Sequence, residues 1–167
     1  MKHFLLVFFI GMSFVTYAQD STVVETKVFL IRHAEVEKDG TSNPPLSVNG
    51  IARSWKWASF LQSEQIDMVF STDLKRTQAT AHAIAENQGI ETIISYDPNT
   101  VNFASFMEKV KGKTVLVVGH SNTTPIFVNQ LIDEQKYGPI NHNDYGNLFI
   151  VTRFSSKEIS VVRLRID

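Results

Sequence analysis

The residues best suited to chemistry stand at the ends of short apolar runs. The run Val28 to Ile31 has the β-branched and aromatic composition of a buried strand, and it stops at Arg32 and His33. Arginine offers a planar fork of donors that fits phosphate or carboxylate, and histidine can be a nucleophile or a proton carrier. Ligands in open α/β sheets bind outside the carboxyl ends of strands, so the Arg-His pair marks a candidate site. A surface arginine beside a hydrogen-bonded histidine is the alternative interpretation.

A second pair of basic residues follows another predicted strand. This strand, at 66–70, leads into a helix that Thr72 or Asp73 can cap. Lys75 and Arg76 lie in the first turn of the helix, where positive charge opposes the helix dipole unless an anion is bound nearby. We therefore interpret this turn as a phosphate site, with a solvated charged face as the alternative.

Two further strand ends carry polar residues. The run 114–118 is the most hydrophobic β-branched stretch of the chain, and His120 and Asn122 come directly after it. Asp97 follows a third predicted strand. His82 lies well inside the helix that carries the basic pair, so we expect a structural or surface role for it.

The rest of the pattern predicts the elements that bring these strand ends together. Ser47 is a suitable N-cap for a helix whose apolar positions are Val48, Ile51, Trp55, Ala58 and Leu61. A loop is predicted at 36–45, further helices at 101–110 and from about 123–125, and closing strands at 148–154 and 159–166. Strands that alternate with helices predict a three-layer α/β fold, with a mostly parallel sheet and helices on both faces. In that fold all the candidate residues lie at one edge of the sheet.

Composition restricts the function further. The 167 residues suit one domain, with 43% hydrophobic and 20% charged residues. A net charge of -1 provides no overall attraction to nucleic acid, so we expect no nucleic-acid partner. The absence of cysteine excludes disulfides, thiolate zinc sites and cysteine nucleophiles. No His-Glu-x-x-His motif occurs, and we expect neither a metal nor another cofactor.

The first residues differ from the rest of the chain. Lys2 precedes an apolar run at 4–15, and small and polar residues follow around Ala18. This pattern predicts a signal peptide at 1–18 and a single domain at 19–167. We therefore expect an exported protein, periplasmic or secreted, without stable membrane association after cleavage. A retained membrane anchor and a core helix are the alternatives.

The candidate residues also resemble a known family. Four pieces, at 30–35, 46–50, 71–81 and 118–122, match the histidine phosphatase superfamily, also called phosphoglycerate mutase-like, in the family's order. The Arg-His piece alone is a weak signal, but the four together are specific. The resemblance implies a phosphoglycerate mutase-like fold and a metal-independent phosphatase. Such an enzyme would hydrolyse a small phosphomonoester through a phosphohistidine intermediate.

The resemblance also implies a role for each matching residue. His33 corresponds to the nucleophile that becomes transiently phosphorylated. Arg32, Arg76 and a protonated His120 correspond to the phosphate-binding core, and Asn122 matches a position often found beside it. These groups would neutralise the charge that develops on the phosphoryl oxygens.

The chain departs from the larger family members in two ways. Ala34 follows the nucleophile where the mutases usually have glycine, and the segment between Ala81 and Thr114 is short where mutases carry an insertion. The chain is thus closer to the short, compact phosphohistidine phosphatase-like branch. Dephosphorylation of phosphohistidine on a protein and an inactive phosphoester-binding domain are the alternative functions.

The proton donor for the leaving group stays open among three carboxyl groups. Asp97 lies in the interval where the mutase-like members keep their acid, and Glu35 is two residues beyond the nucleophile. Asp144 is a more remote candidate. Asp97 could instead only form a turn with Pro98.

Overall fold

A six-stranded mixed sheet forms the centre of the computed structural model, which describes residues 23–166. The predicted signal peptide therefore lies outside the described residues. The strands are β1 (Glu25–Arg32), β2 (Met68–Ser71), β3 (Ile93–Ser95), β4 (Thr114–Gly119), β5 (Asn147–Phe154) and β6 (Ile159–Arg165). Their order is β3-β2-β4-β1-β5-β6, in which the first four are parallel and β5 and β6 are antiparallel additions.

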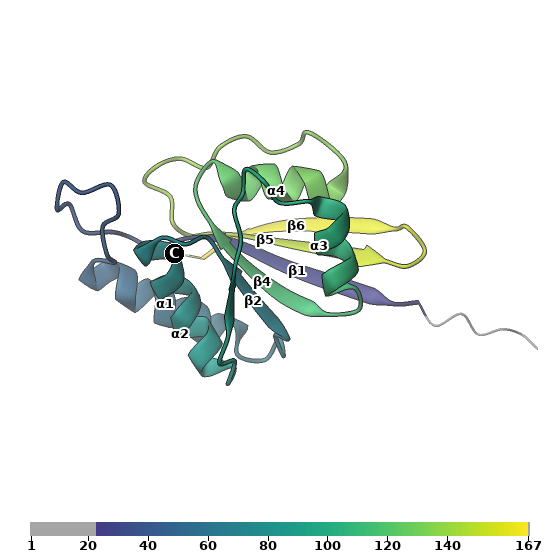
Figure 1. Ribbon diagram of the computed structural model, residues 1–167, viewed down its shortest axis with the longest axis horizontal. Helices are drawn as coiled ribbons and strands as arrows, with labels where there is room; N and C mark the ends of the chain where they lie inside the picture. Colours follow the sequence, from purple (N-terminus) through teal and green to yellow (C-terminus); the bar gives the residue numbers. More distant parts are fainter. Residues whose placement is uncertain (1–22, 167) are drawn as a thin grey trace, which may run out of the picture.

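Helices cover both faces of this sheet, as Figure 1 shows. Helices α1 (Val48–Leu61) and α2 (Lys75–Asn87) pack together on one face, and α3 (Phe103–Val110) and α4 (Thr123–Ile132) lie on the other. The three-layer, mostly parallel α/β fold predicted from the sequence is thus confirmed.

Strand alternation divides the apolar core into two clusters. Val28 and Leu30 of β1 point towards α3 and α4, whereas Phe29 and Ile31 point towards α1 and α2. Every one of these four side chains is at most 1% exposed. A strand buried on both faces reads as a continuous hydrophobic run, which is why β1 could be recognised from the sequence.

The predicted apolar face of α1 is wrong in its first half. The side chains of Val48, Ile51 and Trp55 are 79%, 51% and 45% exposed, whereas Trp57 is buried at 1%. The helix instead turns a face with Gly50 and Ser54 inwards, because Gly50 lies directly against the backbone of Glu35. Only the second half of the helix, with Trp57, Ala58 and Leu61, packs into the core.

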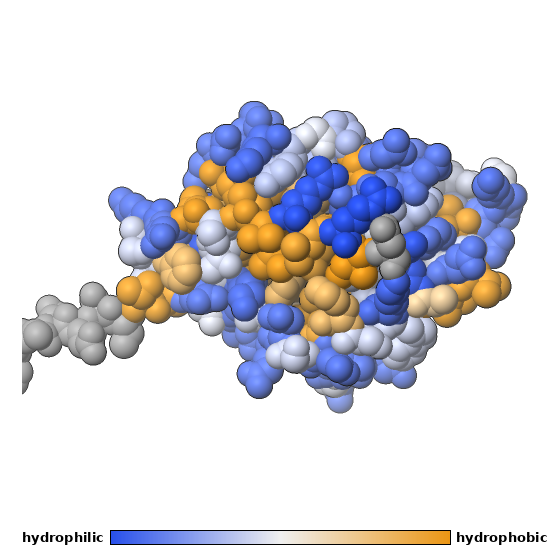
Figure 2. All heavy atoms as spheres, turned by 180° about the vertical axis from the view of Figure 1, so that it is seen from behind, coloured by the Kyte–Doolittle hydropathy of each residue, from blue (hydrophilic) through white to orange (hydrophobic). Residues whose placement is uncertain are grey.

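The face of the sheet that carries α1 and α2 also has exposed apolar side chains. Viewed from behind, hydrophobic residues gather near the middle of the surface (Figure 2). Val162 and Leu164 of β6 are 49% and 38% exposed, and they pair with Ile150 and Leu148 of the cluster under α1 and α2. Within residues 23–166, no helix is both long and apolar enough to cross a membrane.

Candidate active site

The carboxyl ends of the four parallel strands meet at one edge of the sheet. Arg32 at the end of β1 is in register with Gly119 at the end of β4, and the His33 backbone N–H donates to the Gly119 carbonyl at 2.9 Å. At the end of β2, the Ser71 carbonyl accepts from the Tyr96 N–H at 3.0 Å. The polar residues that follow these strands are therefore brought together, as the sequence predicted.

Two adjoining hollows open at this edge. The smaller, of about 350 Å³, is lined by Arg32 and His33, and the larger, of about 700 Å³, is lined by Asp97. The predicted phosphate ligands Arg76, His120 and Asn122 line both hollows. All six residues proposed from the sequence thus line two hollows that share part of their walls.

Arg32 is a buried cation without an anionic partner among the described residues. Its side chain is 2% exposed in the fold, and burial lowers the pKa of the guanidinium from its ordinary value. The Nη1 group donates to the carbonyl oxygens of Asn141, His142 and Asp144 at 3.3, 2.7 and 3.2 Å, while Nε has no hydrogen-bond partner. A buried charge is costly unless it is paired, so this site favours an anion beside Arg32.

His33 presents a defined ring nitrogen. Its Nδ1 lies 2.7 Å from the carbonyl oxygen of Ala34, and because a carbonyl can only accept, Nδ1 carries the proton. The lone pair is therefore on Nε2. Burial first, and then the positive charge of Arg32, lower the pKa of His33 from 6.5 to about 3. The ring is neutral at physiological pH, as an attacking imidazole must be.

The segment after His33 is fixed by α2. The Ala34 N–H donates to Thr80 Oγ1 at 3.0 Å, and this hydroxyl donates to the carbonyl oxygen of Arg76 at 2.7 Å. Thr80 is fully buried. One threonine thus connects the backbone beside His33 to the helical turn that presents Arg76.

A chain of hydroxyl groups sets the orientation of His120. Thr77 Oγ1 donates to backbone carbonyls at 2.9 Å and accepts from Thr72 Oγ1 at 2.9 Å. Since the Thr72 proton is used in that bond, Thr72 accepts from His120 Nε2, which lies 2.9 Å away. The neutral His120 ring therefore carries its proton on Nε2 and its lone pair on Nδ1.

In the site without a ligand, the protonation state of His120 differs from the one that the sequence analysis expected. Burial first, and then the charges of Arg76 and Arg32, lower its pKa from 6.5 to about 4. The ring is therefore neutral at physiological pH, and not protonated as the sequence analysis expected. The centroids of the His33 and His120 rings are 5.5 Å apart.

The start of α2 is capped from a loop and not by its own residues. The expectation that Thr72 or Asp73 caps this helix is wrong, because the N-cap is Leu74 and makes no side-chain bond. Asn43 Oδ1 accepts instead from the Lys75 N–H at 2.9 Å. Burial lowers the pKa of Arg76. Among the described residues its guanidinium makes one long hydrogen bond, from Nη1 to the Ser42 carbonyl at 3.4 Å, so it is available to a ligand.

The three carboxyl candidates for the proton donor lie in different surroundings. Asp97 lines the larger hollow with Arg76 and His120, although its Oδ1 also accepts from the Asn99 N–H at 2.9 Å. Glu35 accepts from Arg53 Nε at 2.8 Å and lines a separate hollow. The Asp144 carboxylate binds Arg165 and lines neither hollow. The structure therefore brings Asp97 to the site and leaves the other two carboxylates engaged elsewhere.

The sequence analysis missed the loop between α4 and β5. This loop supplies the carbonyls that hold Arg32, and the Tyr145 ring lies 4.0 Å from the Arg32 guanidinium carbon. Tyr145 and His142 also line the smaller hollow. The loop does not come directly after an apolar, strand-like run, which is how the other site residues were found. The sequence feature that could have pointed to it is an aromatic residue, Tyr145, among polar ones.

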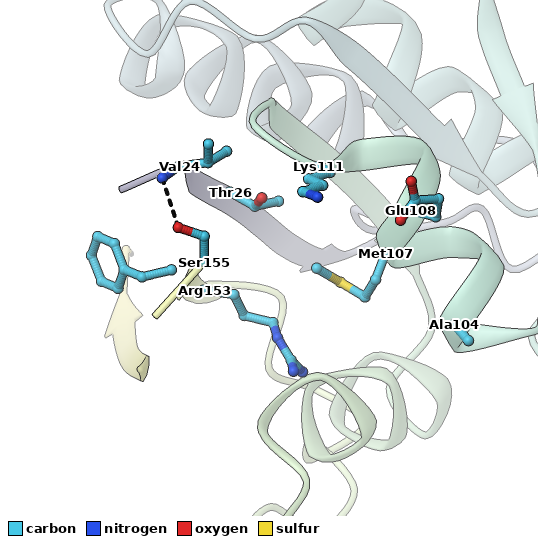
Figure 3. Close-up of a pocket in the computed structure, with 9 residues that line it drawn as sticks. Val24, Thr26, Ala104, Met107, Glu108, Lys111, Arg153 and Ser155 are labelled. Carbon is cyan, nitrogen blue, oxygen red and sulfur yellow. Dashed lines mark hydrogen bonds between the residues drawn. The ribbon is translucent and has the colours of Figure 1, made fainter. Parts of the chain in front are cut away.

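Other features of the described chain do not join this site. His82 is exposed on α2, where its Nδ1 lies 3.6 Å from a Glu86 carboxylate oxygen, which confirms the surface role expected for it. A further hollow, of about 250 Å³, lies at the amino end of β1, where Lys111, Arg153 and Met107 surround it (Figure 3). Residues 23–166 contain no group of three or more His, Cys, Asp or Glu side chains that could hold a metal ion.

Comparison with known proteins gives matches along most of the domain. The family model of the histidine phosphatase superfamily (branch 1) matches residues 28–107, a range that ends before His120. Phosphoserine phosphatase 1 of Hydrogenobacter thermophilus is 38% identical over 73 residues, which are 40% of this chain and 35% of that protein. The 2,3-bisphosphoglycerate-dependent phosphoglycerate mutase of Methanosarcina mazei is 24% identical over 131 residues, which are 71% of this chain and 51% of that protein.

The fold has solved relatives as well. The structure of the protein histidine phosphatase SixA complexed with tungstate superposes with a TM-score of 0.64 at 18% identity, over 83% of this chain and 96% of that chain. The present chain spans only a third to a half of the length of the two curated relatives above. The family match, over just under half of the chain, and the shared fold both support the histidine phosphatase superfamily.

Proposed function

We propose that this protein is a phosphatase that hydrolyses a phosphomonoester through a phosphorylated His33, without a metal ion. The observation that carries the proposal is the pairing of two features in one hollow. A buried Arg32 lacks an anionic partner among the described residues, and beside it stands a neutral His33 whose Nε2 is free to attack. Such a pair suits an anionic electrophile, and a phosphoryl group is both anionic and electrophilic.

In the first step His33 Nε2 attacks phosphorus in line with the leaving oxygen. The nitrogen lone pair forms the P–N bond, while the P–O ester bond breaks and its electrons go to the leaving oxygen. Arg32 and Arg76 stabilise the charge on the phosphoryl oxygens as fixed donors. Asp97, on the wall of the larger hollow, gives its proton to the leaving oxygen in this proposal.

In the second step water clears the phosphohistidine. Asp97, now a carboxylate, takes a proton from the water as its oxygen attacks phosphorus. The P–N bond breaks, its electrons return to His33 Nε2, and phosphate leaves. The Nδ1–H bond to the Ala34 carbonyl is kept throughout and holds the ring in place.

Oxyanion binding would change the protonation of His120. In the free site two arginines and burial keep the ring neutral. A phosphoryl dianion placed between those arginines reverses the local charge and raises the pKa of the ring, because an opposite charge favours the charged form. His120 Nδ1 could then take a proton and donate a hydrogen bond to a phosphoryl oxygen.

The test is to trap the covalent intermediate. Brief reaction with ³²P-labelled phenyl phosphate, quenched without acid, should give a labelled protein whose label is acid-labile and base-stable. His33→Ala should lose both the label and the hydrolysis of 4-nitrophenyl phosphate. His82→Ala, which removes an exposed histidine outside the site, is the matched control and should retain both. Full hydrolysis by the His33→Ala protein would overturn the proposal.

We also propose that the protein acts outside the cytoplasm. The support is the N-terminal sequence pattern, in which a basic residue precedes an apolar run and the small residue Ala18 precedes a polar stretch. N-terminal sequencing of protein purified from the native cell should begin at Gln19. A start at Met1 would contradict this localisation.

A further inference from the structure

The larger hollow begins where the proposed phosphate site ends. It shares Arg76, His120 and Asn122 with the hollow of His33, but His33 itself does not line it. In an in-line displacement the leaving group departs from the side of phosphorus opposite the nucleophile. In the proposed mechanism the larger hollow, which shares three lining residues with the smaller one and is not lined by His33, takes the ester substituent.

The charges on the walls of the larger hollow are unfavourable for an anionic substituent. Apart from Arg76, which the phosphoryl group engages, no lysine or arginine of the described residues lines it. Asp73 and Asp97 contribute carboxyl groups. Asp97 is the proposed proton donor, and neither of its protonation states supplies a positive charge. Asp73 lies just before α2 and has no ion-pair or hydrogen-bond partner among residues 23–166.

An aromatic side chain completes these walls. Tyr96 lines the hollow, and its ring packs edge-on against Phe127 with the centroids 5.7 Å apart. Burial raises the pKa of its hydroxyl, so the residue stays neutral. Aromatic rings together with carboxylates are the groups by which proteins bind ammonium ions.

We propose that the substrate's leaving group carries an ammonium group and no second anionic group, with Asp73 and Tyr96 as the residues that recognise it. The substrate class is then an aminoalkyl phosphate. This inference rests on the proposed phosphatase function. The larger hollow should therefore disfavour bisphosphates and phosphorylated acids. The second anionic group of such a substrate would lie near Asp73, with no basic side chain to pair with it.

The test uses three two-carbon phosphomonoesters that differ in one terminal group. Phosphoethanolamine carries an ammonium, ethyl phosphate a methyl group and phosphoglycolate a carboxylate. We expect kcat/KM to fall in that order, with about tenfold between the first and the last, as expected for one attraction replaced by one repulsion near the surface. Raising the salt concentration should reduce this ratio, because exposed charges are screened.

Variants separate recognition from the intrinsic reactivity of the esters. In Asp73→Asn the ratio of kcat/KM for phosphoethanolamine to that for phosphoglycolate should fall about threefold or more. The intrinsic reactivity of each ester cancels when the ratios of the wild-type and Asp73→Asn proteins are compared, because both are measured on the same two substrates. Glu91→Gln removes an exposed carboxylate just before β3, at the other end of that strand, and should leave the ratio unchanged.

The outcomes also distinguish this inference from the function on which it rests. If the wild-type protein does not hydrolyse 4-nitrophenyl phosphate, the phosphatase proposal itself fails. If it does, but hydrolyses phosphoglycolate as well as phosphoethanolamine, only the proposed substrate class is overturned. An unchanged ratio in Asp73→Asn would likewise remove Asp73 from recognition.

Discussion

At the scale of single residues, the site depends on which ring nitrogen each histidine presents. A carbonyl acceptor puts the proton of His33 on Nδ1, and the hydroxyl chain through Thr72 puts that of His120 on Nε2. The two bonds orient the rings in opposite senses, so that Nε2 of His33 and Nδ1 of His120 carry the lone pairs. One ring is thereby prepared to attack, and the other to accept a proton once an oxyanion is bound.

The two arginines are held to different degrees. Arg32 is fixed by three carbonyls and the Tyr145 ring, whereas Arg76 has one long hydrogen bond to a loop carbonyl. Arg76 therefore keeps most of its donors for the ligand. It also lines both hollows, so in the proposed mechanism it lies beside both the phosphoryl group and the leaving group.

A lysine should not replace Arg76. In Arg76→Lys we expect kcat/KM for 4-nitrophenyl phosphate to fall about 100-fold, because one ammonium cannot reproduce the two-pronged contact with a developing charge. Steady-state kinetics would measure this. Lys75→Ala is the control, since Lys75 is exposed and lines neither hollow, and it should keep most of the activity. Activity in Arg76→Lys close to that of wild type would contradict the role given to the guanidinium fork.

The sequence predicted which residues lie at this site better than it predicted their protonation states. Arg32, His33, Arg76 and His120 could be located because each ends a strand, follows one, or lies in the first turn of the helix after one. Their catalytic roles stay predictions. The neutral state of His120 could not be anticipated, because it results from burial and from two arginines that only the folded chain brings near it.

At the scale of elements, close contacts position the segment that follows β1, close to His33. Gly50, in the first turn of α1, lies so near the segment after β1 that an added Cβ would be 2.0 Å from the Glu35 carbonyl oxygen. The same oxygen accepts from the Ser47 N–H at 3.0 Å, so the start of α1 and the segment after His33 are joined at one point. Only a residue without a side chain allows this approach.

Gly50→Ala should therefore destabilise the protein. We expect a loss of about 1–3 kcal/mol in the free energy of unfolding, because either the helix or the Glu35 backbone must move to make room. Urea denaturation would measure the loss. Gly138→Ala is the control, because a Cβ at Gly138 meets no atom within 4 Å. Equal stability of the Gly50→Ala and Gly138→Ala proteins would contradict this account.

The predictions for helices failed where the same residues suited either a local role in the helix or a tertiary contact. Val48, Ile51 and Trp55 have helical spacing, but the contact of Gly50 with the Glu35 backbone turns the other side of α1 inwards. Thr72 has the chemistry of a helix cap, yet its hydroxyl joins Thr77 to His120. In both cases a tertiary contact overrides a local preference that the sequence expresses correctly.

At the scale of the whole molecule, the chain concentrates uncompensated basic groups at one edge of a nearly neutral protein. The net charge is -1, but two arginines and two neutral histidines surround the smaller hollow. The strand order brings this about, because four parallel strands end at the same edge. The alternation of strands and helices made that arrangement predictable, whereas the α4–β5 loop that completes it gave no comparable signal.

Two site histidines that are neutral in the folded state also make the protein sensitive to acid. The pKa of His33 is about 3 and that of His120 about 4 in the folded chain, against 6.5 in the unfolded chain. Between pH 6.5 and pH 4 the unfolded state therefore binds more protons than the folded state. Because the unfolded state binds more protons, the free energy of unfolding rises with pH in this range and is lost as the pH falls through it.

We expect the midpoint of urea denaturation to fall steadily between pH 6.5 and pH 4, and the double variant His33→Asn, His120→Asn to show a much shallower fall. Asparagine does not titrate, so the variant removes the proton linkage whatever its effect on stability at neutral pH. The relevant quantity is the slope with pH and not the absolute stability. His82→Asn should keep the wild-type slope, because His82 is exposed. An equally steep slope in the double variant would show that other groups, and not the two site histidines, take up the protons on unfolding.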